Sequence, residues 1–479
     1  MGTVFRQKMS KIGCALAAFA LAFSLAPLSA AHAIPTSAKD VADSTVTINN
    51  LLAGDKVEAY LIADADIDSA NNLTYTMASG LPSDFDTIDE IKAVVSDGTS
   101  FVQGSAMQNA ASKIAKAFAD ASTAPAATAT ATGTSAELTL GSGYYLVRVT
   151  STSGQTRVYQ NMVVDVSPTA NASGTYVSHA AQTLDVKKTD VTIEKGVGDN
   201  YKPSTDKYSV GDMVPFQVKT NVPNYPADSK SATFELTDTP TAGLEIDTST
   251  ISIDGATSSD YTLTASTTGY KVVFNKAFIL SHSGQAITVT YKAKLTSDAF
   301  YKDANDVTGN TAKVKFNPNP YTDGTSEPDS NTKVYTYGYV FKKVTPEGVA
   351  LPGATFTITN KATGTVVGTA TSDAKGYVSF SGLAAGEYTL SETVVPAGYS
   401  KIGNWDITIS KDVANGDNPA TDGITEVNFL VDTVDKTDPK QPTLPITGDA
   451  GTFALTAAGV ALLAVGASVL VRSRRQREL

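Results

Sequence analysis

Cysteine, tryptophan and histidine are scarce in this sequence. Its 479 residues include one cysteine, Cys14, one tryptophan and three histidines, and 18% of the residues are charged, with a formal net charge of −11. A single cysteine cannot form a disulfide within the chain. The acidic balance argues against nucleic acid as a partner, because phosphate binding requires clustered Lys and Arg. The length exceeds what one hydrophobic core comfortably supports, so we expect two to four domains.

The two ends of the chain predict export and membrane insertion. Residues 1–33 carry three cations, an apolar run and Ala-His-Ala at the end, which has the form of a signal-peptidase site, so we expect a signal peptide there. Because Cys14 lies in this leader, the exported chain would have no thiol nucleophile. In the segment 449–479, residues 452–471 are uncharged and mostly apolar, and four arginines follow. This pattern is typical of a transmembrane helix with a cytoplasmic basic tail.

A pentapeptide stands just before the predicted membrane segment: Leu444, Pro445, Ile446, Thr447 and Gly448. Together with the apolar span and the basic tail, it resembles the LPXTG sorting signal of Gram-positive surface proteins. The resemblance implies that a membrane transpeptidase, a sortase, cuts between Thr447 and Gly448 and joins the threonine carboxyl to an amine. The alternative is a linker that contains these five residues by chance.

Between these ends the pattern predicts strands, since Thr, Val, Ile and Tyr alternate with polar residues and Gly, Asn and Asp stand at the breaks. The fold class is therefore all-β. One stretch, residues 86–120, has apolar residues at helical spacing, and the Ala/Thr-rich segment 121–135 is expected to be a loop. We place the domains at 34–188, 189–335 and 336–435, followed by a linker and sorting motif at 436–448.

Three polar residues of the middle domain fall on strand faces that should be buried. Lys195, Asp238 and Asn310 each alternate with apolar residues of their own strand. Burial lowers the pKa of a lysine and raises that of a carboxylic acid, so such a pair can hold a neutral amine beside a protonated acid. That amine could attack the asparagine amide, which would release ammonia and leave an isopeptide bond. The alternative is an ion pair whose lysine reaches solvent at a domain edge.

The third domain contains a similar but less regular set, formed by Lys343, Glu392 and Asn428. Its segments 351–356 (Leu-Pro-Gly-Ala-Thr-Phe) and 386–399 (Gly-Glu-Tyr-Thr-Leu-Ser-Glu-Thr-Val-Val-Pro-Ala-Gly-Tyr) resemble the paired signatures of CnaB-like immunoglobulin-type domains.

Two segments of the middle domain, 238–244 and 309–312, resemble the middle domain of Gram-positive fimbrial shaft subunits. The resemblance implies tandem immunoglobulin-like sandwiches in an elongated chain, the first with a helical insertion. It also implies two spontaneous isopeptide bonds. These would join Lys195 to Asn310, promoted by Asp238, and Lys343 to Asn428, promoted by Glu392.

A shaft subunit also needs an acceptor amine, which the resemblance places at the end of the first domain. The matching stretch here lacks the Tyr and Pro of the usual Tyr-Pro-Lys motif, so the match depends on position. Lys187 is the first choice and Lys188 the second; the alternative is two solvated linker lysines. In the first domain, Val149 stands where the third domain has Glu392, so we expect no isopeptide bond within residues 34–185.

No catalytic triad, phosphate-binding loop or metal-ligand spacing accompanies these features, so we expect no turnover enzyme, no cofactor and no metal. We expect a structural subunit of a covalent pilus that supports adhesion and is anchored to the wall of a Gram-positive bacterium. The expected partners are pilus-type and housekeeping sortases, other copies of the chain, peptidoglycan, accessory pilins and a host receptor. The alternative is a non-polymerised wall-anchored adhesin or a basal or tip pilin.

Overall fold

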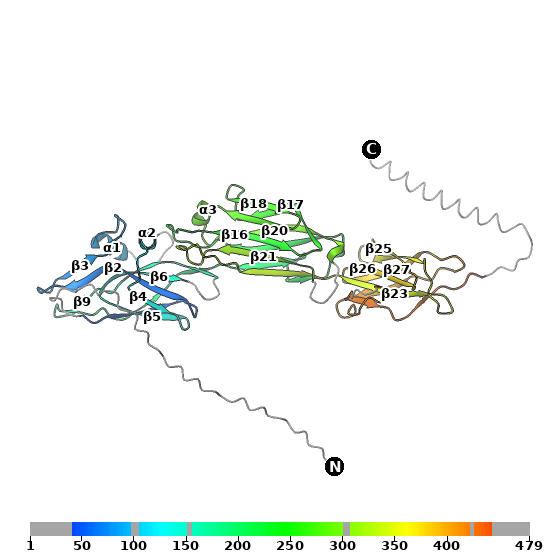
Figure 1. Ribbon diagram of the computed structural model, residues 1–479, viewed down its shortest axis with the longest axis horizontal. Helices are drawn as coiled ribbons and strands as arrows, with labels where there is room; N and C mark the ends of the chain where they lie inside the picture. The colour runs from blue at the N-terminus through cyan, green and yellow to red at the C-terminus, as the bar shows by residue number, and fades with distance from the viewer. Residues whose placement is uncertain (1–40, 97–104, 151–155, 300–306, 422–425, 443–479) are drawn as a thin grey trace, which may run out of the picture. The chain divides into compact units, whose positions relative to one another are not determined.

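The computed structural model describes residues 41–96, 105–150, 156–299, 307–421 and 426–442 (Figure 1). The predicted signal peptide, the Leu444–Gly448 motif and the predicted membrane segment lie outside the described residues. Within the described ranges, no helix is long and apolar enough to cross a membrane. The chain divides into two compact units: unit 1 takes in the described parts of 1–51, 57–148 and 162–185, and unit 2 the remainder.

The described part of unit 1 contains two larger sheets, a two-stranded hairpin and two helices. In the smaller sheet, β1 (Ser44–Asn49) pairs antiparallel with β5 (Ser135–Leu140) and parallel with β11 (Gln182–Asp185). The larger sheet contains β3 (Leu73–Met77), β2 (Lys56–Ile67), β6 (Gly143–Thr150) and β8 (Met162–Asp165) in that order, with β4 (Ala127–Thr130) beside β2. A short hairpin is formed by β9 (Thr169–Ala170) and β10 (Tyr176–Val177).

The predicted helical stretch is confirmed as two helices, α1 (Ile88–Ser96) and α2 (Ala106–Asp120). Ser105 caps α2 by accepting a hydrogen bond from the Gln108 amide, which is the usual device for starting a helix. The expectation of a loop over 121–135 is wrong in one place, because β4 forms there and pairs with β2. Its Ala-Thr alternation offers little apolar contrast, so the period-2 signal of a strand is weak in the sequence.

The middle part of unit 2 is a sandwich of two sheets that enclose one hydrophobic core (Figure 1). The first sheet has the order β13 (Ile193–Val197), β15 (Met213–Asn221), β20 (Ala286–Leu295), β17 (Leu244–Asp254). The second has the order β14 (Ser204–Thr205), β22 (Asp329–Val334), β21 (Gly309–Phe316), β16 (Phe234–Pro240), β19 (Gly269–Phe274), β18 (Tyr261–Ser266). Helix α3 (Lys276–Ser281) and a short 3-10 turn η1 (Ser297–Ala299) lie in the connections.

The third sandwich has its own core. One sheet is built on β23 (Tyr337–Val344), which pairs antiparallel with β26 (Tyr377–Leu383) and parallel with β29 (Phe429–Val431) and β30 (Lys436–Thr437). The other has the order β25 (Val366–Thr371), β24 (Thr355–Asn360), β27 (Gly386–Val394), β28 (Trp405–Ile409). The all-β fold class with tandem sandwiches and a helical insertion in the first domain is confirmed.

The structure differs from the predicted boundaries in two places. Segment 52–56 and the described parts of segment 149–161, expected in the first domain, belong to unit 2. There β7 (Arg157–Tyr159) pairs with β12 (Lys188–Asp190), and Val158 enters the core of the middle sandwich. Strand β30, expected in the linker, is an integral part of the third sandwich because it pairs with β23.

Candidate functional site

A lysine and an aspartate from opposite sheets meet in the core of the middle sandwich. Lys195 on β13 and Asp238 on β16 have no exposed side-chain surface, and the ammonium nitrogen pairs with the carboxylate. Burial lowers the pKa of Lys195 from its ordinary value, although the neighbouring Asp238 acts to raise it. The alternative of a lysine that reaches solvent at a domain edge does not fit this side chain.

Asn310 completes the predicted group from β21, the strand next to β16. It is buried, and its Nδ2 donates a hydrogen bond to the Tyr291 hydroxyl at 2.7 Å. Its carbonyl oxygen Oδ1 is buried and has no hydrogen-bond partner in the described structure. The amide is thus held from one side, with its carbonyl left free of hydrogen bonds.

Tyr291 on β20 is a member of this cluster that the sequence reasoning missed. Its hydroxyl accepts from Lys195 Nζ at 2.7 Å and donates to Asp238 Oδ1 at 2.9 Å. The sequence did contain a signal for this residue. Buried and more exposed residues alternate along β20, and Tyr291 is the one residue on the buried face of this strand whose side chain carries a polar group. A tyrosine on such a face usually finds a hydrogen-bond partner.

Aromatic rings enclose the cluster and keep water away from it. The Phe216 ring stacks on Tyr291 at 5.3 Å between centroids, and Tyr270 packs edge-on against Tyr291 at 5.4 Å. Lys195 Nζ lies 5.3 Å from the centroid of Phe216. This surrounding is the apolar, rigid environment that a neutral amine requires.

The third sandwich holds a second buried lysine and a second acid. Lys343 on β23 has no exposed side-chain surface, and its Nζ lies 2.6 Å from Oδ1 of Asp438, which is equally buried directly after β30. Nζ also donates to the main-chain oxygen of Lys436 at 3.0 Å. Glu392 on β27 is buried beside them and accepts from the Ile402 amide at 3.0 Å. Burial raises the pKa of Glu392, and the charge of Asp438 adds to this rise.

The prediction that Asn428 is the partner of Lys343 is wrong. Asn428 stands just before β29, whose first residue pairs with Gly338, so Asn428 is level with Tyr337. Lys343 is six positions further along β23, which corresponds to about 20 Å at roughly 3.3 Å per residue. Asn428 instead adopts a left-handed backbone conformation, with φ of 65°, and its main-chain oxygen accepts from the Gly338 amide at 3.0 Å.

The two candidate acceptor lysines differ in their surroundings. Lys187 lies between β11 and β12 with an exposed side chain, and its main-chain oxygen accepts from the Gln160 amide at 2.9 Å. Lys188 is half-buried within β12, where it stands opposite Tyr159.

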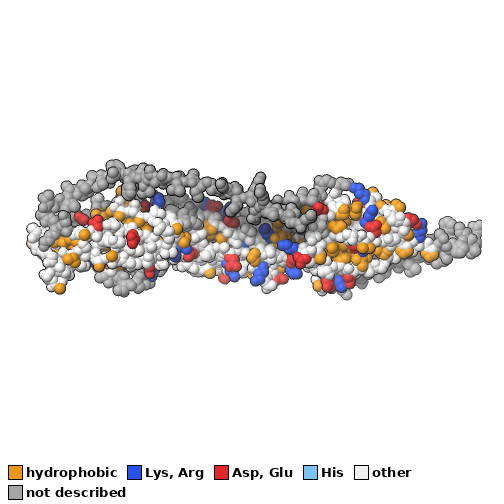
Figure 2. Space-filling model, turned by 90° about the horizontal axis from the view of Figure 1, so that it is seen from below, with side chains coloured by type: hydrophobic (Ala, Val, Ile, Leu, Met, Phe, Trp, Pro, Cys, Tyr) orange, Lys and Arg blue, Asp and Glu red, His pale blue; other side chains and the backbone are white. Residues whose placement is uncertain are grey.

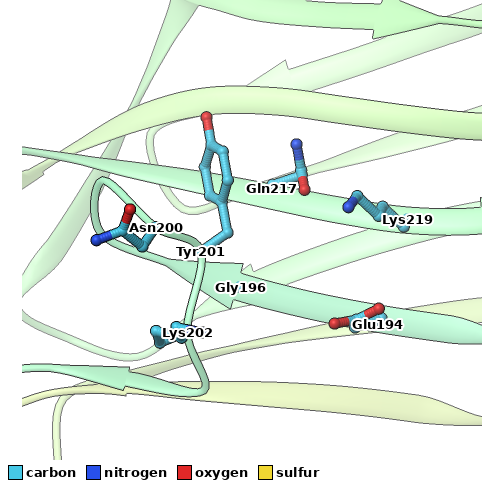
Figure 3. Close-up of a pocket in the computed structure, with 7 residues that line it drawn as sticks. All are labelled: Glu194, Gly196, Asn200, Tyr201, Lys202, Gln217 and Lys219. Carbon is cyan, nitrogen blue, oxygen red and sulfur yellow. The ribbon is translucent and has the colours of Figure 1, made fainter.

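A polar pocket lies on the outer face of the strand that carries Lys195 (Figure 3). It is lined by Glu194, Gln217 and Lys219 from β13 and β15 and by the turn 200–202. The turn folds back over Gly196, where any side chain would overlap Tyr201. Because Glu194 alternates with the buried lysine, this pocket does not open on Lys195. Among the described residues on the face seen in Figure 2, Lys and Arg are mixed with Asp and Glu.

Two family models match the chain. Residues 338–422 match the prealbumin-like fold domain SpaA, and residues 436–478 match the LPXTG cell wall anchor motif. No curated protein matches the chain. The protein is therefore an LPXTG-anchored cell-wall surface protein of the Gram-positive type.

Two solved structures have a fold similar to that of this chain. The T6 backbone pilin of serotype M6 Streptococcus pyogenes, which has a modular three-domain structure, is similar with a TM-score of 0.65 and 16% identity over 85% of this chain and 100% of that chain. The major pilin SpaD from Corynebacterium diphtheriae is similar with a TM-score of 0.53 and 18% identity over 83% of this chain and 98% of that chain. The chain thus has the fold of these two major pilins.

Proposed function

We propose that this protein is the shaft subunit of a sortase-assembled pilus. In the polymer, the Thr447 carboxyl of one subunit is joined to the Lys187 amine of another, and the basal end is linked to peptidoglycan. The observation that carries the proposal is the cell wall anchor match at 436–478, because a sorting motif supplies the acyl donor for both links. The shared fold with backbone pilins supports the shaft role.

Exposure favours Lys187 over Lys188 as the acceptor. A sortase acyl-enzyme must reach the attacking nitrogen, so the amine has to project from the surface. Lys187 is exposed and its main chain is fixed beside β12, whereas the side chain of Lys188 is half-buried. A fixed backbone with an exposed amine presents the nucleophile at low entropic cost.

The buried cluster of the middle sandwich supports an isopeptide bond between Lys195 and Asn310. The neutral amine of Lys195 attacks Cγ of Asn310, the bond from Cγ to Nδ2 breaks, and one proton moves from Nζ to Nδ2, which leaves as ammonia. Asp238 holds the amine in place. It also takes up the proton that the ammonium group of Lys195 loses before the neutral amine attacks. The bond would tie β13 of one sheet to β21 of the other, so that tension cannot peel the sheets apart.

In the third sandwich the geometry supports a bond from Lys343 to Asp438 in place of Asn428. Nζ attacks Cγ of the protonated Asp438 carboxyl, one hydroxyl leaves with a proton from Nζ, and the product is water. Glu392, whose pKa is raised by burial, supplies and recovers protons for this step. The bond would join the first strand, β23, to the residue after the last strand, β30.

An immunoblot of muramidase-released wall extract tests the shaft role. Cells making the wild-type chain are compared with cells making Lys187→Ala and Lys188→Ala. We expect a high-mass ladder that resists boiling in detergent from wild type and Lys188→Ala, and a single wall-linked band from Lys187→Ala. A single band in every lane would contradict polymerisation and favour a wall-anchored adhesin or a basal or tip pilin.

A further inference from the structure

The hydroxyl of Tyr291 lies at the centre of the buried cluster in the middle sandwich. It accepts hydrogen bonds from Lys195 Nζ and from Asn310 Nδ2, each at 2.7 Å, and donates to Asp238 Oδ1 at 2.9 Å. One oxygen therefore contacts the attacking nitrogen, the departing nitrogen and the acid of the proposed bond. Because both nitrogens lie 2.7 Å from the same oxygen, the attacking and departing nitrogens are close to each other.

We propose that Tyr291 is a catalytic residue of bond formation that relays one proton from the Lys195 amine to the departing amide nitrogen of Asn310. The inference rests on the proposed bond between these two residues. As the bond from Nζ to Cγ forms and the bond from Cγ to Nδ2 breaks, Nζ must lose one proton and Nδ2 must gain one. The hydroxyl takes the first proton and gives up its own, so it ends unchanged and no further reactant is needed.

The surroundings of Tyr291 suit this role. Stacked Phe216 and edge-on Tyr270 fix the ring, and the described cluster is closed to solvent, so the hydroxyl bridges the two nitrogens where bulk water does not reach. Burial, with the nearby Asp238 charge, raises the pKa of Tyr291 well above its ordinary value. The hydroxyl consequently keeps its proton for transfer instead of ionising.

Tyr270 provides a matched control within the same cluster. Its ring is as buried as that of Tyr291 and packs against it, but its hydroxyl has no hydrogen-bond partner in the described structure. Replacing either tyrosine with phenylalanine keeps the aromatic ring. The Tyr270 hydroxyl, however, forms no hydrogen bond with either reacting nitrogen in the described structure.

The test follows bond formation by intact mass during cell-free synthesis of residues 34–447, with peptide mapping of the Lys195–Asn310 link. Loss of ammonia lowers the mass by about 17 Da once the oxygen removed by the substitution is allowed for. We expect Tyr291→Phe to form the link about 100-fold more slowly than wild type, and Tyr270→Phe to match wild type. Equal rates for Tyr291→Phe and wild type, or equal slowing by both substitutions, would overturn the relay.

A second measurement keeps the test independent of folding. Fluorotyrosine at position 291 retains the ring and its packing but makes the hydroxyl more acidic, so the rate and its pH profile should change if the hydroxyl moves protons. An unchanged profile would refute the relay. Full mass in wild type would remove the proposed bond itself, and the relay with it, which distinguishes that outcome from a relay that fails while wild type is bonded.

Discussion

At the scale of single residues, each sandwich of unit 2 buries one lysine with acids that have no access to water. An unpaired buried charge is costly, so such a lysine is retained only with a partner. In the middle sandwich the partners are Asp238 and Tyr291, and in the third they are Asp438 and Glu392. The chemistry proposed for both sites follows from this desolvation.

Replacing Asp438 should separate the two candidate partners of Lys343. Asp438→Ala removes the carboxyl that lies 2.6 Å from Nζ, so this bond cannot form. The loss of about 18 Da that accompanies release of water in wild type should therefore be absent from the intact mass of this variant. Asn428→Ala is the matched control and should keep the deficit. Intact-mass spectrometry of both variants decides, and a deficit lost only in Asn428→Ala would restore the asparagine as the partner.

The lowered pKa of Lys195 predicts a pH dependence of stability when the bond is absent. In Asn310→Ala the lysine stays unbonded, and between its folded pKa and its ordinary value near 10.5 the unfolded chain binds more protons than the folded one. The free energy of unfolding should therefore rise as the pH rises through this window. Urea titrations at several pH values measure the slope, which Asn310→Ala with Lys195→Met should lack. Equal slopes in the two variants would contradict the depressed pKa.

Strand alternation predicted both buried lysines and the acids Asp238 and Glu392, because a period of two assigns a face once the strand is recognised. It could not assign Asp438, since the residue follows a two-residue strand whose pairing with β23 is set by tertiary contacts. The error at Asn428 has the same origin. The sequence around 428 predicts a strand, but it does not indicate which residues of β23 that strand lies beside.

At the scale of elements, the first and third domains contain the same local structure at the start of one strand each. Gly143 and Gly386 open β6 and β27, and the tyrosine two positions later donates to a main-chain oxygen four residues before it, Tyr145 to Gly141 at 3.1 Å and Tyr388 to Ala384 at 2.8 Å. The two domains therefore share this local structure. Helix spacing likewise predicted α1 and α2.

Each proposed bond should stabilise its own sandwich, because the cores of the two sandwiches are separate. Either cross-link closes a loop of roughly 100 residues, for which loop-closure entropy gives about 4.7 kcal/mol. Calorimetry of Asn310→Ala should show one transition about 10 °C lower or more and a second unchanged, and Asp438→Ala should show the reverse. If both variants shift one shared transition, the sandwiches unfold together and the local account fails.

At the scale of the whole molecule, the proposed links define a linear polymer. In the proposed polymer each subunit would have one donor, Thr447, and one acceptor, Lys187, so each would join at most two neighbours and the polymer would have two unlike ends. Only the end with an unused threonine carboxyl can be transferred to the wall. Anchoring and polymerisation therefore compete for the same carboxyl but not for the same amine, and they can be separated by substitution.

A subunit with Lys187→Ala should enter this polymer at one end only. It can still give its threonine carboxyl to a wild-type lysine, but it cannot attack the carboxyl of another subunit, so no subunit can precede it. When an epitope-tagged Lys187→Ala chain is co-expressed with an untagged wild-type chain, immunogold microscopy should show one label per pilus, at the end distal from the cell. A tagged Lys188→Ala chain is the matched control and should label the whole length. Labels along the shaft from tagged Lys187→Ala would show that another lysine accepts the link, while the shaft role itself would stand.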